Sequence, residues 1–386
     1  MKLLILQIAL MNFLKKKEPF KIFSMIYLLL DTITNRAGTE RAVINLANNL
    51  HANGHRVSLV SVCTKEGEPS FQVEKGIEVH HLGIRLYGNA LARKTVYFKA
   101  YRRIKALYKK REPVLLIGTN IFINTILSQI SNRGRIFTIG CEHISYDIAR
   151  PITKRIRGFL YSGLDAVVAL TKRDQQSFEA ILRGRSKAYV IPNQVSFTTV
   201  QRDATTHKQM LAIGRLTYQK GFEFMIEDAS RVLRERPDWK LIIVGDGENE
   251  SMLRKEIASR NMESQIEIHP STPEIRKYYE SSAIYLMTSR FEGLPMVLLE
   301  AEAYALPIIS YDCPTGPREL IENGRNGFLV PMEAHEDFAD KLRLLMDDET
   351  LRKKMGQESE LMVKSYSPAN IYECWKKLFV EIGYMN

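Results

Sequence analysis

Two cations lie close together in GRLTYQKG, a segment that follows a short apolar run near the middle of the chain. Arg215 and Lys220 are five residues apart. On a loop between a strand and a helix, a planar guanidinium and a compact ammonium at this spacing can face one ligand, as a diphosphate requires. Most exposed Lys and Arg side chains have no specific ligand. The segment therefore indicates either a diphosphate site or an ordinary charged surface loop.

Two carboxylates, Glu292 and Glu300, lie eight positions apart in the segment FEGLPMVLLE. Pro295 predicts the first residue of a helix, because proline has no N–H to satisfy there. The free amides of that first turn, beside the small Gly293, favour an anion. Both carboxylates can accept hydrogen bonds from ribose or sugar hydroxyls. Alternatively, Glu292 partners the helix dipole and Glu300 lies on the helix surface, although the apolar run around Glu300 disfavours an unpaired charge.

Several other chemistries are excluded by missing patterns. The chain has no G-x-G-x-x-G opening a helix and no G-x-x-x-x-G-K-[ST], which disfavours dinucleotide oxidoreductases and P-loop enzymes. It has no D-x-D motif for a divalent metal. Its four cysteines are too widely spaced for a metal site or a dense disulfide framework, and we expect buried thiols in a reducing compartment: Cys63, Cys141, Cys313 and Cys374.

Short apolar runs alternate with helical patterns from Met25 onward, which is typical of parallel α/β units. A helix is predicted over 40–53, stopped by Gly54. Strands are predicted over 25–30, 57–62, 77–82, 114–117, 136–140, 166–170 and 188–191, and then over 210–213, 241–244, 266–269, 284–287, 308–311 and 327–330. The sequence predicts two doubly wound domains that face each other across a cleft, where ligands bind beyond the carboxyl ends of the strands.

The length of 386 residues fits two domains, and 45% hydrophobic with 26% charged residues indicates a soluble globular protein. We expect the first domain over 25–195, a linker over 196–207, the second domain over 208–365 and a C-terminal helix over 366–386 that packs back on the first domain. The net charge of +11 is uneven: residues 1–200 hold 31 Lys+Arg against 13 Asp+Glu, and the remainder hold 24 against 31. Domains of opposite charge suggest different partners.

The first 24 residues are an extension with an apolar run from Leu3 to Leu14 followed by three lysines. This run is shorter than the roughly 20 residues that span a bilayer, and its charge follows the apolar stretch, unlike an export signal. Three interpretations stay open: an interfacial helix, an extra helix packed on the domain, or a start codon assigned upstream of a true first residue at Met25.

The motifs together resemble the retaining glycosyltransferases of family 4, which have the two-domain GT-B fold. The resemblance covers most of residues 25–386. It is carried by GRLTYQKGF from Gly214, LIIVGDGE from Leu241, the E-x7-E pair of Glu292 and Glu300, and CPTGPRELIENGRNGFLV from Cys313. Each string alone is moderately specific, and their order and spacing make the resemblance strong.

The resemblance implies roles in binding a nucleotide-sugar donor. Arg215 and Lys220 would hold the diphosphate, and Glu300 would accept the ribose hydroxyls. Glu292, with the backbone of Gly293 and Leu294, would hold the donor sugar and its phosphate.

The resemblance also extends to the first domain. Gly38 lies in a stretch, AGTER, that resembles the family's glycine-rich turn near the donor phosphates, with Ala37 where many members have a second glycine. His143 resembles the family's loop histidine, which reaches the donor sugar near the reacting carbon. The expected catalytic residues are therefore His143, Arg215, Lys220 and Glu292.

The expected reaction is retaining and needs no metal ion or cofactor. Because the leaving group is already a diphosphate, no protein acid is required, and the site must stabilise charge that grows on the phosphate. The expected partners are a UDP-sugar donor carrying a hexose or N-acetylhexosamine and a saccharide or polyprenyl-linked acceptor.

The acceptor is expected on the basic first domain. The stretch 93–111 carries nine Lys+Arg and no acid, interleaved with aromatic residues. Arg102, Arg103, Lys109 and Lys110 would contact an anionic inner-membrane surface, so we expect a peripheral protein on the cytoplasmic face of the membrane. A solvated helix face is the alternative. No nucleic-acid motif accompanies the charge, and no nucleic-acid partner is expected.

Two other functions stay open at this point. One is a sugar-nucleotide 2-epimerase of similar fold, which the E-x7-E and G-P-R-E strings disfavour. The other is a non-catalytic basic adaptor that binds membrane or nucleic acid.

Overall fold

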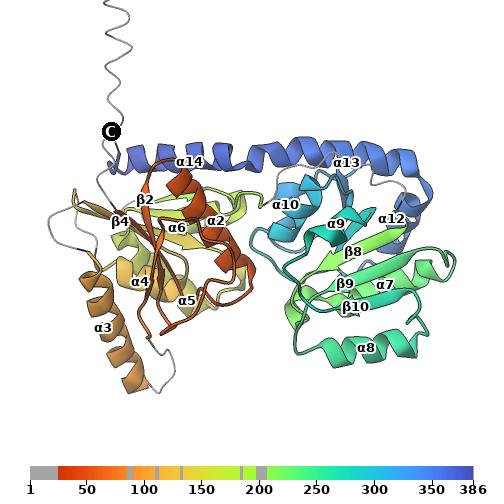
Figure 1. Cartoon of the computed structure of the whole chain (residues 1–386), viewed down its shortest axis with the longest axis horizontal. Helices are drawn as coiled ribbons and strands as arrows, with labels where there is room; N and C mark the ends of the chain where they lie inside the picture. The colour runs from red at the N-terminus through yellow and green to blue at the C-terminus, as the bar shows by residue number, and fades with distance from the viewer. Residues whose placement is uncertain are drawn as a thin grey trace, which may run out of the picture.

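Two lobes lie side by side in the computed structural model, each with a parallel sheet and helices on both faces (Figure 1). The structure describes residues 25–84, 90–108, 113–130, 134–182, 186–196 and 207–385. The predicted fold class, α/β with two Rossmann-like parallel-sheet domains, is confirmed. The amino-terminal extension and most of the expected linker lie outside the described residues.

The first domain is built on a seven-stranded parallel sheet in the order β3-β2-β1-β4-β5-β6-β7. Alternate residues of β1 enter two apolar clusters, Ile26 and Leu28 on one face and Tyr27 and Leu29 on the other. A strand buried on both faces has a continuous apolar sequence. The strands are β1 (Met25–Leu30), β2 (Arg56–Ser61), β3 (Glu78–His81), β4 (Val114–Gly118), β5 (Ile136–Glu142), β6 (Ala166–Ala169) and β7 (Lys187–Val190).

Helices cover both faces of this sheet. The first described helix, α2, ends as predicted before Gly54, whose φ of 86° is a left-handed conformation that suits glycine. The helices are α2 (Gly38–Ala52), α3 (Ala90–Ala106), α4 (Ile121–Leu127), α5 (Pro151–Leu160) and α6 (Lys172–Leu182), with short 3-10 turns η1 (Tyr146–Ile148) and η2 (Tyr161–Gly163).

The second domain has a six-stranded parallel sheet in the order β10-β9-β8-β11-β12-β13. Its strands are β8 (Gln209–Ile213), β9 (Lys240–Val244), β10 (Ile266–His269), β11 (Ile284–Met287), β12 (Ile308–Tyr311) and β13 (Gly327–Val330). Its helices are α7 (Phe222–Leu233), α8 (Glu250–Ser259), α9 (Arg276–Glu280), α10 (Met296–Ala303), α11 (Pro317–Leu320), α12 (His335–Asp347) and α13 (Glu349–Val363), with the 3-10 turn η4 (Tyr218–Lys220).

One predicted helix start is wrong by a residue. Pro295 is the N-cap of α10, with φ −72° and ψ 107°, and Met296 is the first helical residue. This extended conformation is that of an N-cap residue, whose carbonyl already accepts a helical hydrogen bond, here from the amide of Leu298 at 3.0 Å. The first helical amide is therefore that of Met296, which leaves one more N–H near the expected anion site.

The carboxyl-terminal helices run along one edge of both domains (Figure 1). Helix α13 packs on α10 of the second domain. After η5 (Lys364–Tyr366), α14 (Pro368–Glu381) buries Ile371, Trp375 and Phe379 in the apolar cluster of the first domain.

The chain therefore crosses between the domains twice, and both crossings meet at α2. The amide of Val195 donates to the carbonyl of Tyr366 at 2.9 Å. Asn49 of α2 donates to Gln194 at 2.6 Å and to the carbonyl of Pro368 at 2.8 Å. The buried Asn49 side chain thus joins the two crossings to the first domain.

Candidate active site

Lys220 and Glu292 meet at the carboxyl edge of the second sheet. The loops that carry them follow the neighbouring strands β8 and β11. Lys220 Nζ lies 2.6 Å from Glu292 Oε1, and both side chains are largely buried. A carboxylate of the chain itself therefore neutralises the cation that the sequence assigned to a diphosphate.

Arg215, by contrast, is exposed, and no ion pair joins it to a described residue. Its loop is held by close backbone packing, since a Cβ on Gly245 would lie 1.9 Å from the carbonyl oxygen of Gly214. The amide of Leu216 also donates to the carbonyl of Asp246 at 2.8 Å. Arg215 thus extends from a well-fixed loop with its guanidinium available for an anion.

Glu300 is almost completely buried and is bound from both domains. Its Oε1 lies 2.5 Å from Arg41 Nη1 of α2, and its Oε2 accepts a hydrogen bond from the Tyr279 hydroxyl at 2.8 Å. Burial raises the pKa of the Glu300 carboxyl, and the Arg41 guanidinium opposes that rise. Both carboxylate oxygens are engaged, so a ribose would have to replace or share one of these partners.

The Glu292 loop touches the first domain at Gly293. A Cβ on Gly293 would lie 2.3 Å from the carbonyl oxygen of His143, so only glycine allows this approach. Leu294 is buried in an apolar cluster that also includes Ala42 and Leu170 of the first domain. Among the described residues, none accepts a hydrogen bond from the amides of Gly293 and Leu294. Two amide donors therefore lie free beside the His143 loop.

His143 follows β5 directly and is partly buried. Burial lowers the pKa of its imidazole to about 4, so the ring is neutral near pH 7. His143 also lines a cavity of about 30 Å³ with Thr119 and Trp375. A neutral imidazole can exchange hydrogen bonds with a sugar without adding charge to the site.

The amino-terminal ends of α2 and α10 approach each other across the domain boundary. Gly38 is the first residue of α2, and the nearest neighbour of a Cβ placed on it would be Met296 Cγ, at 4.0 Å. Ala37 has φ −129° and ψ 169°, an extended conformation, so the absence of a second glycine causes no strain. Two helix amino termini at one place favour an anionic ligand.

Two residues next to Gly38 were not assigned a role from the sequence. One is Arg41, the partner of Glu300. The other is Glu40, which is buried and whose Oε2 accepts no hydrogen bond from a described residue. Burial raises the pKa of Glu40, Asp31 raises it further, and the positive charge of Arg215 lowers it. The string GTER was visible, but a single sequence does not show which residues of the other domain it faces.

The expected membrane residues lie on or beside α3, away from this site. Arg102 and Arg103 are exposed on α3, and Arg103 also donates to the carbonyl of Leu82. Lys109 and Lys110 lie outside the described residues. Helix α3 is at the end of the first domain that is remote from the second domain (Figure 1). The patch and the donor site are therefore separate surfaces.

The described part of the chain has neither a cluster of metal ligands nor a membrane-spanning helix. No three His, Cys, Asp or Glu side chains there are grouped so as to hold a metal ion. No helix there has the length and apolar character needed to cross a membrane. Of the four cysteines, all free, Cys141 and Cys313 are buried as expected, whereas Cys63 and Cys374 are only partly buried.

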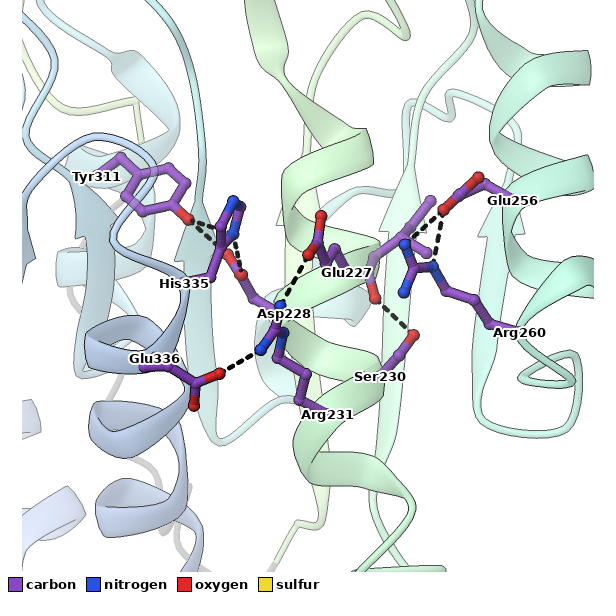
Figure 2. Close-up of polar contacts among 10 residues, drawn as sticks. Glu227, Asp228, Ser230, Arg231, Glu256, Arg260, Tyr311, His335 and Glu336 are labelled. Atoms are coloured by element: carbon purple, nitrogen blue, oxygen red, sulfur yellow. Dashed lines mark hydrogen bonds and ion pairs between the residues drawn. The ribbon is translucent and has the colours of Figure 1, made fainter.

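A second cluster of titratable groups lies in the second domain (Figure 2). Asp228 of α7 is fully buried and lies 2.6 Å from His335 Nδ1 and 2.8 Å from the Tyr311 hydroxyl. Tyr311 belongs to the apolar cluster with α7 and α12, whereas Leu294 and Leu298 of the site belong to the cluster on the other face of the sheet. This triad joins α7, β12 and α12 and does not contribute to the candidate active site.

Comparisons with known proteins agree with this architecture. Residues 36–198 match the family described as Glycosyltransferase Family 4, and residues 197–362 match Glycosyl transferases group 1. The amylovoran biosynthesis glycosyltransferase AmsD of Erwinia amylovora is 32% identical over 362 residues, covering 91% of this chain and 98% of that protein.

Two further proteins are similar over most of the chain. An alpha-1,4-N-acetyl-D-galactosaminyltransferase of Campylobacter jejuni, whose name gives a PP-undecaprenol saccharide, is 27% identical over 90% of this chain and 96% of its own. TarM of S. aureus, solved in complex with UDP, superposes with a TM-score of 0.78 at 14% identity over 92% of this chain and 100% of its own. The fold, the matched families and the AmsD relative together show that the chain belongs to the group 1 glycosyltransferases of GT-B fold.

Proposed function

We propose that the protein is a retaining, metal-independent glycosyltransferase that moves a hexose or N-acetylhexosamine from a UDP-sugar to a lipid-linked saccharide. The product would be an intermediate of surface polysaccharide assembly. The AmsD relative is named for amylovoran biosynthesis, the Campylobacter relative for a PP-undecaprenol saccharide, and the TarM structure for its complex with UDP. These names support the proposal for donor, acceptor and pathway class.

The observation that carries the proposal is the meeting of two helix amino termini beside an unpaired cation. Gly38 of α2 approaches Met296 of α10, the amides of Gly293 and Leu294 are free, and Arg215 is exposed near Glu40. Backbone amides, helix dipoles and a guanidinium are the groups that stabilise a departing diphosphate. We assign this place to the diphosphate of the donor.

The remaining residues receive roles around that diphosphate. Lys220 would exchange its contact with Glu292 for the phosphate, which would free Glu292 to accept a sugar hydroxyl. Glu300 would bind the ribose through one carboxylate oxygen while Arg41 or Tyr279 keeps the other. The neutral His143 would contact the donor sugar near the reacting carbon, because its main chain already touches Gly293.

The acceptor would bind on the first domain, at the membrane surface. In this proposal the protein is peripheral on the cytoplasmic face, where the exposed Arg102 and Arg103 attract anionic lipid.

A donor panel tests this function. The purified protein is incubated with UDP-sugars without acceptor, and released UDP is measured, since transferases hydrolyse their donor slowly. We expect UDP release with one of the UDP-sugars. When acceptor is added, we expect NMR to show an α-linked product from the α-linked donor. Conversion of the donor to its C2 epimer would instead indicate the epimerase. No release and no thermal shift with any donor would indicate an adaptor.

A further inference from the structure

Helix α5 and the turn before it carry an unusual exposed apolar surface. The five large apolar side chains left exposed there are Ile144 (60%), Ile148 (40%), Ile152 (62%), Ile156 (41%) and Phe159 (83%). An isolated exposed apolar residue is ordinary, but a contiguous group marks an interaction site. We call these five residues the α5 surface.

An ordinary surface helix turns its apolar stripe toward the core, whereas α5 turns its apolar stripe toward solvent. Ile152, Ile156 and Phe159, spaced at i, i+4 and i+7, form one outward stripe. The inward face carries Arg157, which is buried and lies 2.7 Å from the buried carboxylate of Glu142. A buried ion pair holds the helix in this orientation, so its apolar face is presented by a well-packed element.

Positive charge surrounds the α5 surface. Arg150 and Arg155 are exposed, and neither pairs with an acid among the described residues. The one acid between residues 144 and 160 is Asp147, which pairs with Arg173 at 2.7 Å. An apolar stripe flanked by unpaired cations complements an anionic lipid surface, where apolar side chains enter the headgroup boundary and cations meet phosphates.

The α5 surface also begins at the candidate active site. Ile144 follows His143 directly, and its Cα is 3.7 Å from the position of a Cβ on Gly293. Glu142, the partner of Arg157, precedes His143. A membrane contacted by the α5 surface would therefore lie close to the His143 and Gly293 loops of the candidate active site, which the acceptor must reach.

We propose that the α5 surface docks on a bilayer that contains anionic lipid, inserting Ile152, Ile156 and Phe159 at the headgroup boundary. This rests on the lipid-linked acceptor of the proposed function and names a contact distinct from α3. Helix α3 offers cations, but Phe98 is the one large apolar side chain exposed among its described residues. It would contribute attraction without insertion.

A tryptophan reporter tests insertion. Trp239 and Trp375 are both buried, so a tryptophan in Phe159→Trp is distinguished by its exposed environment. With vesicles of phosphatidylcholine and phosphatidylglycerol, its emission should shift to the blue and be quenched by brominated acyl chains. With phosphatidylcholine alone the shift should be weaker, and added salt should reduce it. Absence of both shift and quenching on bound protein would overturn the proposal.

Matched variants test the contribution to binding. The triple variant Ile152→Ser, Ile156→Ser, Phe159→Ser should lower the vesicle partition coefficient about tenfold or more. The control triple variant Met252→Ser, Leu344→Ser, Leu361→Ser removes similarly exposed apolar groups from the second domain. It should change the vesicle partition coefficient by less than about twofold. Circular dichroism checks that both variants fold.

The outcomes separate docking from catalysis. The α5 triple variant should keep wild-type UDP release and wild-type turnover on a soluble acceptor analogue, and lose turnover on acceptor in vesicles. Unchanged vesicle binding in the triple variant would overturn the proposal. The proposal would also be overturned if light scattering showed a dimer for the wild type and a monomer for the triple variant, because the α5 surface would then join two copies of the chain. Absence of UDP release by the wild-type protein would instead count against the proposed function.

Discussion

The guanidinium of Arg41 lies 2.5 Å from the carboxylate of Glu300, across the boundary between the two domains. Arg41 is in the first helix of the first domain, and Glu300 is in the helix that follows the Glu292 loop of the second. The Arg41 guanidinium offsets the desolvation cost of burying the Glu300 carboxylate. Because the two residues belong to different domains, the ion pair is lost when the domains move apart.

Glu300→Gln should lower UDP affinity while the protein stays folded. A charged acceptor becomes an amide that accepts with one atom and donates with the other, so its hydrogen bonds to ribose are weaker. We expect a loss on the order of tenfold, measured by titration calorimetry. Glu302→Gln is the control, because Glu302 is equally buried on α10 but pairs with Asn326. Equal UDP affinity in the Glu300 variant and the wild type would remove Glu300 from the nucleotide site.

Arg215→Ala and Lys220→Ala should both reduce turnover at saturating donor, since their charge is most important as the diphosphate leaves. Their effects on stability should differ. Lys220→Ala leaves the largely buried Glu292 without its cation and should lower the free energy of unfolding by about 1–3 kcal/mol. Arg215 is exposed, and its loss should cost less than about 0.5 kcal/mol. Urea unfolding and steady-state rates measure both. Wild-type rates in both variants would refute the diphosphate assignment.

Gly293→Ala should abolish turnover without unfolding the second domain. The added Cβ would meet the carbonyl oxygen of His143 at 2.3 Å, so the two loops must separate. Gly38→Ala is the comparison, because its Cβ would have 4.0 Å to its nearest neighbour and causes no collision in the free protein. Turnover assays and hydrogen exchange at the His143 loop distinguish the two. Full activity in Gly293→Ala would show that the contact is not required.

Activity should survive chelation. The described residues contain no group of carboxylates, histidines or cysteines suited to a divalent ion. Turnover measured after dialysis against EDTA should equal that of the untreated protein. A loss that magnesium or manganese restores would contradict a metal-independent reaction.

A fifth prediction concerns stability against pH. His55 is buried, and burial lowers the pKa of its imidazole to about 4 from 6.5. The unfolded state then binds a proton more readily than the folded state, so this contribution is complete above pH 6.5 and is lost as the pH falls toward 4. Between pH 7.5 and 5 the loss should be roughly 1–2 kcal/mol. Urea unfolding of His55→Phe should show a smaller decrease over this interval. An identical decrease in both proteins would mean that His55 does not titrate in this way.

Much of the fold could be predicted because its strands are buried on both faces and give uninterrupted apolar runs. The second-domain strands over 266–269, 284–287, 308–311 and 327–330 have the predicted bounds. The burial of Glu300 was also foreseeable from the apolar residues around it. The helix boundary at Pro295 was predicted less accurately, because the fixed φ of proline suits both the N-cap and the first helical residue, and only its ψ of 107° distinguishes the two.

Pairings between the domains could not be predicted from one sequence. Arg41 and Glu300 are far apart in the chain, and nothing in either local pattern identifies the other. The same holds for Lys220 and Glu292, whose separate roles were visible but whose ion pair was not. The α5 stripe has a regular helical spacing, which indicates an amphipathic helix without showing whether the apolar face is inward or outward.

The two chain crossings restrict how the two domains can move apart. Val195 and Tyr366 are hydrogen-bonded to each other, and Asn49 joins the neighbouring residues of both crossings to α2. Two tethers at one point act as a hinge, so the domains can rotate about an axis through that point but cannot slide apart. Contacts far from the axis then travel furthest for a given rotation, whereas those near it hardly move. Opening and closing of the site is therefore a rotation about this point, and Asn49→Ala would loosen it by removing the hydrogen bonds that join both crossings to α2.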